Sequence, residues 1–389
     1  MAYASAFFSA GSGSPAAAPA ALRGRGAVTN VGHRYQSDPR QAVDDGWGSD
    51  PAGPQGRARR TTVRIEHARS VLARNDSPDI PFDRSVNPYR GCEHGCVYCY
   101  ARPTHAYLGL SPGLDFETRL VAKANAVQAL RAELARPGYR PQAITLGSAT
   151  DAYQPVERDW KLARGLLGLL LETRHPVVIV TKGALVERDL DLLAPLAAQG
   201  LAAVYVSLTT LDPAMARTLE PRAAAPWRRL QAMQSLARAG VPVGVSVAPV
   251  IPFVNDDNLE RILAAARDAG AQRASYTMLR LPWEVRTVFE QWLQAHFPDR
   301  AARVLHRIED LRGGRRNDPA FGSRMRGTGI WADLFAQRFA LAVRKLGLNA
   351  RRFELDTGRF VPPAAPSALP PAAAGGRAGA PVRQLGLFD

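Results

Sequence analysis

From residue 83 onward, short apolar or β-branched runs alternate with longer amphipathic stretches, and this alternation is the strongest constraint on the fold. The expected strands are 84–88, 143–147, 177–181, 202–208, 243–248 and 273–279. Helical spacing of apolar residues is found near 120–135, 157–174, 187–199, 226–239, 256–269 and 284–296. Strands that alternate with helices in this way predict a parallel sheet covered by helices.

Two topologies can hold such an alternation, a doubly wound sheet and a full or partial (β/α) barrel. No Gly-x-Gly-x-x-Gly sequence follows any expected strand, so the nucleotide-binding version of the doubly wound sheet loses its main support. Both topologies remain open at this point. In a barrel, functional side chains gather where the strands end, at their carboxyl edge.

The amino-acid composition predicts how the chain is divided into a core domain and flanking segments. Residues 1–60 are rich in Ala, Gly, Ser and Pro and contain no acidic residue before Asp38, which predicts a disordered low-complexity extension. An organellar transit peptide would share this composition. We expect the core barrel at 61–300, a helical extension with polar loops at 301–360, and a disordered, Pro- and Ala-rich tail at 361–389.

Charge and hydropathy narrow the class of partner. No run of about eighteen apolar residues is present, so we expect a soluble, cytoplasmic protein without a membrane partner. The formal net charge is +15, and only four of the 50 basic residues are lysine. The excess charge indicates an anionic partner such as nucleic acid, although a GC-rich genome would also favour arginine.

The three cysteines of the chain lie within eight residues, in the order Cys92-x3-Cys96-x2-Cys99, directly after the first expected strand. A disulfide framework needs pairs spread along the sequence, so this odd cluster indicates metal in a reducing compartment. Gly91 and Gly95 allow the loop to curl around one centre. Three thiolates can bind three irons of a four-iron cubane and leave the fourth iron open.

Zinc is the alternative occupant of this loop. A histidine such as His94 or His105 would then complete the ligand set with the three cysteines. Classical structural zinc sites instead pair Cys-x2-Cys with a second, distant pair of ligands, and this chain has no further cysteine.

With Tyr98 in the aromatic position, the loop resembles the signature of the radical S-adenosylmethionine (SAM) superfamily, Cys-x3-Cys-x-aromatic-Cys. The resemblance implies a partial (β/α)6 barrel and a [4Fe–4S] cluster on Cys92, Cys96 and Cys99. It also implies that the open iron chelates SAM, that an electron cleaves SAM to a 5′-deoxyadenosyl radical, and that this radical abstracts hydrogen from a substrate. Flavodoxin or ferredoxin would supply the electron, and the backbone near Tyr98 would contact the adenine.

Polar residues follow the next three expected strands, in the segments 147–157, 181–183 and 207–209. They resemble the spore photoproduct lyase branch of the superfamily, in which a Thr/Ser-Asp segment, a Thr-Lys pair and a serine of the fourth strand surround SAM. Carried over position by position, Thr150, Lys182 and Ser207 become candidates for SAM contacts, with Ser148 or Asp151 assisting. Segments 219–222, 227–230 and 248–256 also resemble this branch, where glycine is common at the position of Phe253.

One departure from the branch concerns its chemistry. Photoproduct lyases use a cysteine outside the cluster motif to return a hydrogen atom, and this chain has Ser148 in that segment and no further cysteine. An alcohol O–H bond is too strong to replace a thiol, so we do not expect the lyase reaction in that form. Tyr153 or Tyr276 would be another hydrogen donor, or would simply pack in the barrel.

The last residues, 383–389, follow the Pro- and Ala-rich tail. Gln384, Leu385, Leu387 and Phe388 resemble the Gln-Leu-x-Leu-Phe peptides that bind the bacterial DNA sliding clamp. Such a peptide would bring the enzyme to DNA, whereas the alternative is a tail that folds back onto the barrel.

Three functions therefore compete. We expect a radical SAM enzyme that acts on DNA or another nucleic acid. The second reading is a radical SAM enzyme that acts on a protein or a small metabolite, and the third is a non-catalytic, metal-stabilised adaptor of the DNA clamp. The fold cannot choose among them, because one barrel supports many chemistries.

Overall fold

The computed structural model describes residues 21–36 and 60–364. Most of the expected N-terminal extension lies outside the described residues. So does the tail from residue 365 onward, with the expected clamp-binding residues Gln384, Leu385, Leu387 and Phe388.

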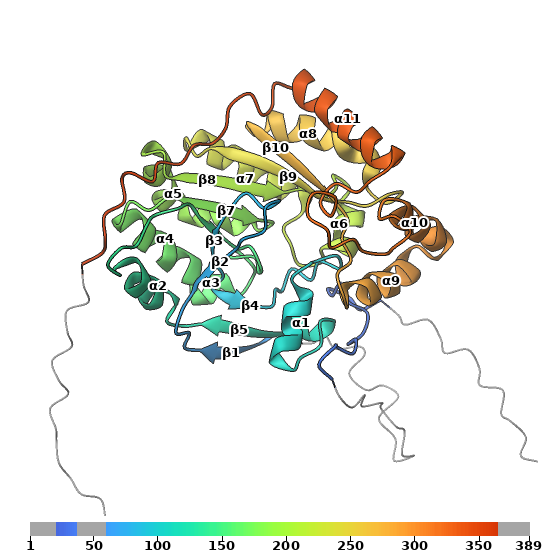
Figure 1. The fold of residues 1–389 in the computed structure, drawn as a ribbon, viewed down its shortest axis with the longest axis horizontal. Helices are drawn as coiled ribbons and strands as arrows, with labels where there is room; N and C mark the ends of the chain where they lie inside the picture. Colours follow the sequence, from blue (N-terminus) through green and yellow to red (C-terminus); the bar gives the residue numbers. More distant parts are fainter. Residues whose placement is uncertain (1–20, 37–59, 365–389) are drawn as a thin grey trace, which may run out of the picture.

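A seven-stranded sheet forms the centre of the molecule, in the order β10-β9-β8-β7-β6-β3-β2 (Figure 1). Six of these strands are parallel neighbours in chain order, and β2 pairs antiparallel with β3 at the edge. The edge strands β10 and β2 do not pair with each other, so the expected partial (β/α)6 barrel is confirmed as an open one. The bounds are β2 Leu72–Arg74, β3 Arg84–Val86, β6 Ile144–Leu146, β7 Val177–Thr181, β8 Ala202–Ser207, β9 Val243–Val250 and β10 Arg273–Met278.

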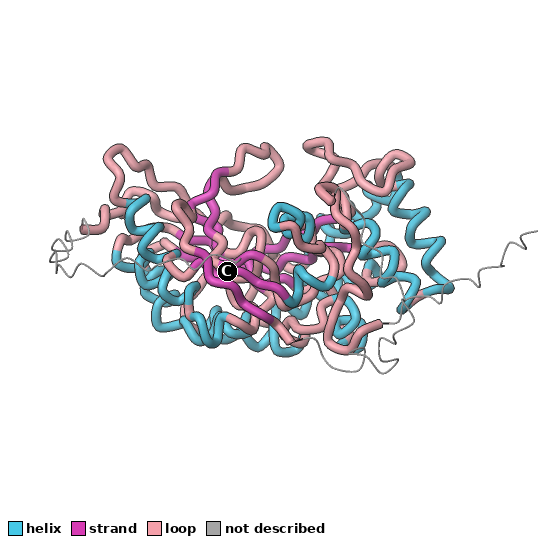
Figure 2. Tube along the Cα trace, turned by 90° about the horizontal axis from the view of Figure 1, so that it is seen from below, coloured by secondary structure: helices cyan, strands magenta, loops and turns pink. Residues whose placement is uncertain are grey.

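Helices cover one side of these strands, and loops stand on the opposite side (Figure 2). The helices that follow the strands in the chain are α2 Ala126–Leu134, α3 Glu157–Trp160, α4 Leu162–Glu172, α5 Leu190–Ala198, α6 Pro213–Leu219, α7 Pro226–Arg238, α8 Leu259–Asp268 and α9 Val285–His296. Each expected helix is present over at least part of its range, and α6 was not expected.

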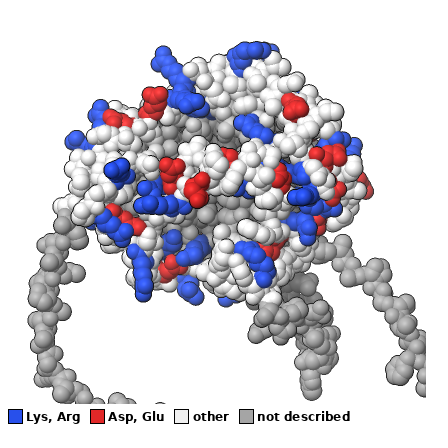
Figure 3. Space-filling view, in the orientation of Figure 1, with Lys and Arg blue, Asp and Glu red and all other residues white. Residues whose placement is uncertain are grey.

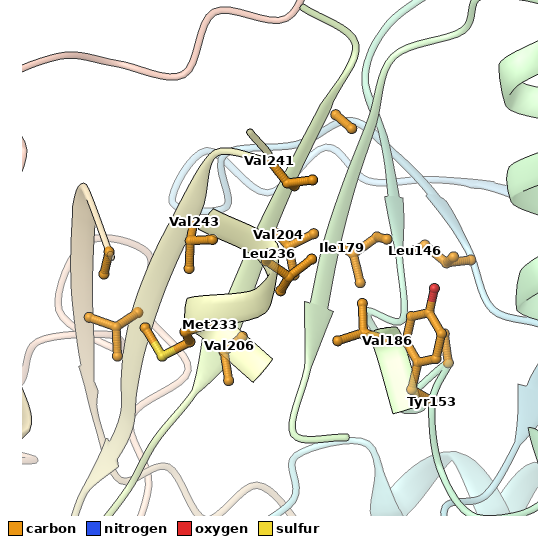
Figure 4. Packing of buried hydrophobic residues seen from close by; sticks show 14 of the residues in the cluster. Leu146, Tyr153, Ile179, Val186, Val204, Val206, Met233, Leu236, Val241 and Val243 are labelled. Atoms are coloured by element: carbon orange, nitrogen blue, oxygen red, sulfur yellow. The ribbon is translucent and has the colours of Figure 1, made fainter. Parts of the chain in front are cut away.

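The main core lies between the sheet and the helices. Val204 of β8 lies near Leu236 of α7, whereas Leu146 of β6 and Ile179 of β7 lie near Val186, and all five side chains are fully buried (Figure 4). Burying one side chain of this size contributes about 1.5–3 kcal/mol relative to leaving it exposed. The β-branched strand residues and the apolar stripe of α7 therefore hold the strand ends, and the loops after them, in place.

The expected helix at 120–135 is wrong over its first turn. Residues 119–123 form strand β5 (Arg119–Lys123), which pairs in parallel with β1 (Thr62–Glu66) and antiparallel with β4 (Tyr89–Arg90). Leu120, Val121 and Ala122 are all buried, and β5 is the central strand of this small sheet. Both partner strands are distant in sequence, and a local pattern does not indicate them.

Residues 21–36 differ from the disorder expected for the N-terminal extension. Ala27 and Val31 are buried against Leu114 of α1 (Leu114–Thr118) and Val288 of α9. The rest of residues 1–60, apart from residue 60, lies outside the described part of the chain. This segment therefore packs onto the domain between α1 and α9.

Beyond residue 297, helices α10 (Pro298–Asp310) and α11 (Ile330–Lys345) extend the barrel, with α10 packed on α9 and α11 on α8. The loop between them carries the expected polar residues and returns to the sheet, where Met325 accepts a hydrogen bond from the backbone of Met278. Among the described residues, no helix is long and apolar enough to cross a membrane.

Candidate cluster and cofactor site

The cysteine loop connects β4 to a 3-10 helix at Arg102–Leu108, on the same edge of the sheet as the carboxyl ends of the strands. Gly91 and Gly95 have φ angles of 78° and 68°, the left-handed region that glycine adopts without strain. A Cβ atom on Gly95 would lie 2.8 Å from Oε2 of Glu117. The glycines expected to curl the loop are thus required by its backbone and by its packing.

The three thiols share one environment. Cys92 and Cys96 are buried and Cys99 is half-buried. Burial, followed by the charges of Asp151 and of the other two cysteines, raises the pKa of Cys92 well above its usual value. Burial likewise raises the pKa of Cys96 to about 12. The three thiols therefore lie in one largely buried loop.

The donor set fits a cluster whose cysteines each bind a different iron. In residues 21–36 and 60–364, no three His, Cys, Asp or Glu side chains converge as the ligands of a single ion would. His105 Nε2 bonds the carbonyl of Arg119 at 2.9 Å, and burial lowers the His105 pKa to about 4. His94 Nδ1 lies 3.2 Å from Oδ2 of Asp151. Both histidines proposed for zinc are thus directed at other groups.

Arg102 supports the backbone of the cysteine loop. Its guanidinium donates to the carbonyl oxygens of Cys96 at 2.8 Å and Gly95 at 3.0 Å, and to Glu117 at 2.5 Å. Neither Arg102 nor Glu117 is exposed. The sequence analysis missed this pair, since no local pattern marks a buried ion pair.

Thr150 supports the loop from the side of β6. Its hydroxyl donates to the carbonyl of Gly91 at 2.7 Å and accepts from Gln154 Nε2 at 2.9 Å. Gln154 in turn accepts from the backbone N–H of Glu93 at 2.8 Å. The residue proposed to contact SAM is therefore engaged with the cysteine loop itself, and Gln154 is a second support that was not expected.

Asp151 connects the loop after β6 with the end of β7. Its carboxylate accepts from the Thr181 hydroxyl and from the Lys182 backbone N–H, both at 2.7 Å. Burial alone would raise the pKa of Asp151, but His94 and these donors lower it well below its usual value. An ionised Asp151 thus fixes where the Lys182 side chain begins.

The Lys182 side chain reaches the cysteine loop. Its Nζ lies 5.7 Å from the ring centroid of Tyr98, whose hydroxyl donates to Glu220. Glu220 also accepts from Arg229 and from the Thr209 hydroxyl, the latter at 2.9 Å. Burial would lower the pKa of Lys182, but Cys96 and Glu220 raise it, so the lysine carries a positive charge beside the loop.

Ser207, at the end of β8, is connected to the same network. Its carbonyl accepts from Arg229 Nη1 at 3.0 Å, and the residue is buried. Arg229 and Glu220 lie in segments that the sequence analysis noted, but neither had a role assigned. Tyr98, Lys182 and Ser207 lie around the Glu220–Arg229 pair, whereas the hydroxyl of Thr150 is bonded to the carbonyl of Gly91.

The remaining candidates have structural partners. Tyr153 donates to Asp189 at 3.1 Å within the main core, and the ring of Tyr276 packs on Phe339 of α11 at 4.7 Å. Ser148 Oγ accepts from Asn87 at 3.1 Å. Tyr153 and Tyr276 therefore pack in the core and against α11, which is the second of the two roles considered for them.

Arg90 and Phe253 are explained by their local geometry. Arg90 pairs with Glu66 on the surface at 3.0 Å. Phe253 has a φ angle of 61°, the conformation that glycine adopts most readily, which accounts for glycine at this position in the similar branch. Arg303 lies 4.2 Å from the Phe253 ring centroid and covers the side chain that glycine would lack.

The domain that holds the cysteine loop is similar in sequence to a known protein family. The family model of the Radical SAM superfamily matches residues 86–266, the part of the chain that holds the cysteine loop and most of the barrel. Residues 86–266 are thus similar in sequence to a radical SAM domain. Members of this superfamily typically use a [4Fe–4S] cluster and SAM.

Two proteins are similar in sequence to this chain, and both are described as uncharacterized. An uncharacterized protein of Mycobacterium tuberculosis is 40% identical over 226 residues, which cover 58% of this chain and 66% of that protein. An uncharacterized protein of Methanocaldococcus jannaschii is 28% identical over 173 residues, or 44% of this chain and 61% of that protein. The matches span just under two thirds of the length of these relatives.

Among solved structures, the chain is similar to spore photoproduct lyase in complex with a dinucleoside spore photoproduct. The TM-score is 0.52 at 16% sequence identity, and the match covers 74% of this chain and 80% of that one. A single-residue variant of the same lyase matches with a TM-score of 0.52 at 15% identity. The two proteins share the fold.

Proposed function

We propose that this protein holds a [4Fe–4S] cluster on Cys92, Cys96 and Cys99 and cleaves SAM reductively, so that the resulting 5′-deoxyadenosyl radical abstracts hydrogen from a nucleic-acid substrate. The observation that carries the proposal is the single loop of three free, largely buried cysteines in a sequence without a fourth cysteine. Three cysteine ligands leave one iron of a cubane open for SAM.

The residues around the loop have separable tasks in this proposal. Arg102 and Gln154 hold the loop backbone, so the thiols keep their positions when iron is absent. Lys182 places a positive charge beside Cys96 in a buried setting, where it offsets the negative charge of thiolates or binds a carboxylate. Glu220 and Arg229 neutralise each other and keep Tyr98 in place.

The proposed SAM contacts are Tyr98, Thr150, Lys182 and Ser207. Lys182 has the charge to bind the SAM carboxylate, and Ser207 is buried at the end of β8, where its carbonyl accepts from Arg229. The hydroxyl of Thr150 is engaged with Gly91 and Gln154, so we propose that Thr150 acts chiefly by positioning the cysteine loop.

Two facts support nucleic acid as the substrate class. The chain carries a formal net charge of +15, and the lyase with the similar fold binds a dinucleoside photoproduct. The reaction itself differs from a thiol-dependent one, because no cysteine remains outside the loop to return a hydrogen atom. A flavodoxin or ferredoxin as electron donor, a cytoplasmic location and a clamp contact through residues 384–388 complete the proposal.

The test is anaerobic reconstitution of the full chain with iron and sulfide, followed by reduction in the presence of SAM. We expect four irons per chain and formation of 5′-deoxyadenosine, with both lost in Cys96→Ala. Stoichiometric zinc without 5′-deoxyadenosine would contradict the proposal. SAM cleavage without any oligonucleotide binding at modest salt would favour a protein or small-metabolite substrate instead.

A further inference from the structure

Three aromatic side chains stand exposed next to one arginine at the surface. Tyr35, Tyr107 and Trp283 are 55%, 65% and 67% exposed. The Cζ atom of Arg34 lies 4.7, 5.4 and 4.6 Å from the centroids of these three rings, in that order. The residues come from three separate segments, so this aromatic rim is a product of the tertiary fold.

The rim is held in a defined shape. The Arg34 guanidinium donates two hydrogen bonds to Glu284, at 3.0 and 2.9 Å, and Glu284 is nearly buried. Trp283 has a φ angle of 46°, which a bulky side chain rarely adopts. Such strain persists where the surroundings enforce it and is common at ligand sites. Because Trp283 is largely exposed, packing of its ring in the core does not explain the strained backbone.

A cavity of about 490 Å³ adjoins the rim. It is within the size range of ligand pockets, about 300–1,000 Å³. Arg286 and Arg315 line it and have no salt-bridge partner within the described ranges, whereas Arg316 is paired with Glu290 and Glu309. The aromatic rim and the positive charges of Arg286 and Arg315 therefore border the same cavity.

The rim also lies close to the proposed reaction centre. Leu279 and Leu281, in the loop that leads from β10 to Trp283, belong to one apolar cluster with Cys96 and Tyr98. Tyr107 follows the cysteines in the 3-10 helix that Arg102 begins. The rim and the cysteine loop are thus connected through one packed apolar cluster.

We propose that Tyr35, Tyr107 and Trp283, with Arg286 and Arg315, bind an unpaired stretch of nucleic acid. The rings stack on bases, which costs an alanine variant about 1–3 kcal/mol per base in known cases, and the arginines contact phosphates. A duplex hides its base faces and is bound through a broad basic surface. The exposed faces of the three rings therefore fit the bases of an unpaired strand better. On the face seen in Figure 3, Lys and Arg are interspersed with Asp and Glu.

This inference rests on the proposed function, and its test uses the full, reconstituted chain. Binding of a fluorescent 12-nucleotide oligothymidine is followed by anisotropy at several salt concentrations. We expect Trp283→Ala to weaken binding about tenfold and Arg286→Gln to reduce the salt slope by about one. Trp227→Ala, at a 57% exposed tryptophan on α7, and Arg261→Gln, at an exposed arginine on α8, are the matched controls.

Each outcome is decisive. Unchanged binding in Trp283→Ala and Arg286→Gln would overturn the rim as the binding site, and so would an equal loss of binding in the controls. SAM cleavage by the same variants would still support the proposed function. Tighter binding of the matching duplex would overturn the unpaired form of the ligand. If the wild-type chain binds no oligonucleotide, this inference and the proposal of a nucleic-acid substrate both fail. Formation of 5′-deoxyadenosine then still tests whether the protein holds a cluster that cleaves SAM.

Discussion

Arg102 and Glu117 form an ion pair with 2.5 Å between Nη2 and Oε1, and neither side chain is exposed to solvent. The carboxylate also accepts the backbone N–H groups of Gly26 and Ala27, at 3.0 and 2.8 Å. One carboxylate thus ties the N-terminal segment to the arginine that supports the backbone of the cysteine loop. Buried charges are stable only when they are paired and hydrogen-bonded in this way.

Arg102→Met is expected to destabilise the protein strongly. The variant leaves Glu117 as an unpaired buried charge, which costs about 3–5 kcal/mol in comparable cases. Urea unfolding of the full chain measures the loss. Arg131→Met is the control, because Arg131 pairs with Glu172 on the surface, where a pair contributes at most about 1 kcal/mol. Equal losses in the two variants would contradict a special role for the buried pair.

Gly26→Ala is expected to loosen the N-terminal segment from the cysteine loop. A Cβ atom at this position would lie 1.8 Å from the carbonyl oxygen of Gly95, so the backbone must move. We expect a loss of about 1–3 kcal/mol in the free energy of unfolding. Gly168→Ala in α4 is the counterpart, since nothing lies within 4 Å of its Cβ, and a gain of about 0.5–1 kcal/mol is expected there. A stable Gly26→Ala protein would show that the segment does not press on the loop.

Lys182→Met is expected to weaken SAM binding by about tenfold, because a charged hydrogen bond contributes about 1.5–3 kcal/mol. Titration calorimetry on the anaerobically reconstituted protein gives the dissociation constant. Lys345→Met, at an exposed lysine of α11, serves as the control and should bind SAM as the wild type does. An unchanged dissociation constant in Lys182→Met would remove the lysine from the SAM site.

His175 is expected to make stability depend on pH between about 6.5 and 4. Its ring bonds the Pro176 carbonyl at 3.0 Å and the Tyr139 hydroxyl at 2.8 Å, and burial lowers its pKa to about 4. The unfolded chain, with a histidine pKa of about 6.5, binds the proton more readily. This stabilisation is therefore complete above pH 6.5 and is lost as the pH falls toward 4.

The measurement for His175 is the urea midpoint as a function of pH. His175→Gln should flatten the fall between pH 6.5 and 4, whereas His306→Gln, at an exposed histidine of α10, should leave it unchanged. A wild-type profile in His175→Gln would mean that other groups cause the acid sensitivity.

Tertiary contacts explain where the sequence analysis was incomplete. Strand β5 was read as the start of a helix, because its pairing with β1 lies more than fifty residues away in the chain. The burial of Ala27 and Val31 depends on helices α1 and α9, and residues 21–36 have the composition of a disordered segment. The roles of Glu220 and Arg229 depend on Tyr98, which is 122 residues before Glu220.

The sequence by itself determined the alternation of strands and helices and the similarity to a radical SAM domain, because hydrophobic periodicity and cysteine spacing are local properties of the chain. It also placed Gly91 and Gly95 correctly, since a tight loop of thiols needs their backbone freedom. Only the tertiary structure decided which charges meet in the interior and which rings gather at the surface. Arg102 finds Glu117, and Arg34 finds Trp283, through contacts between segments that folding alone brings together.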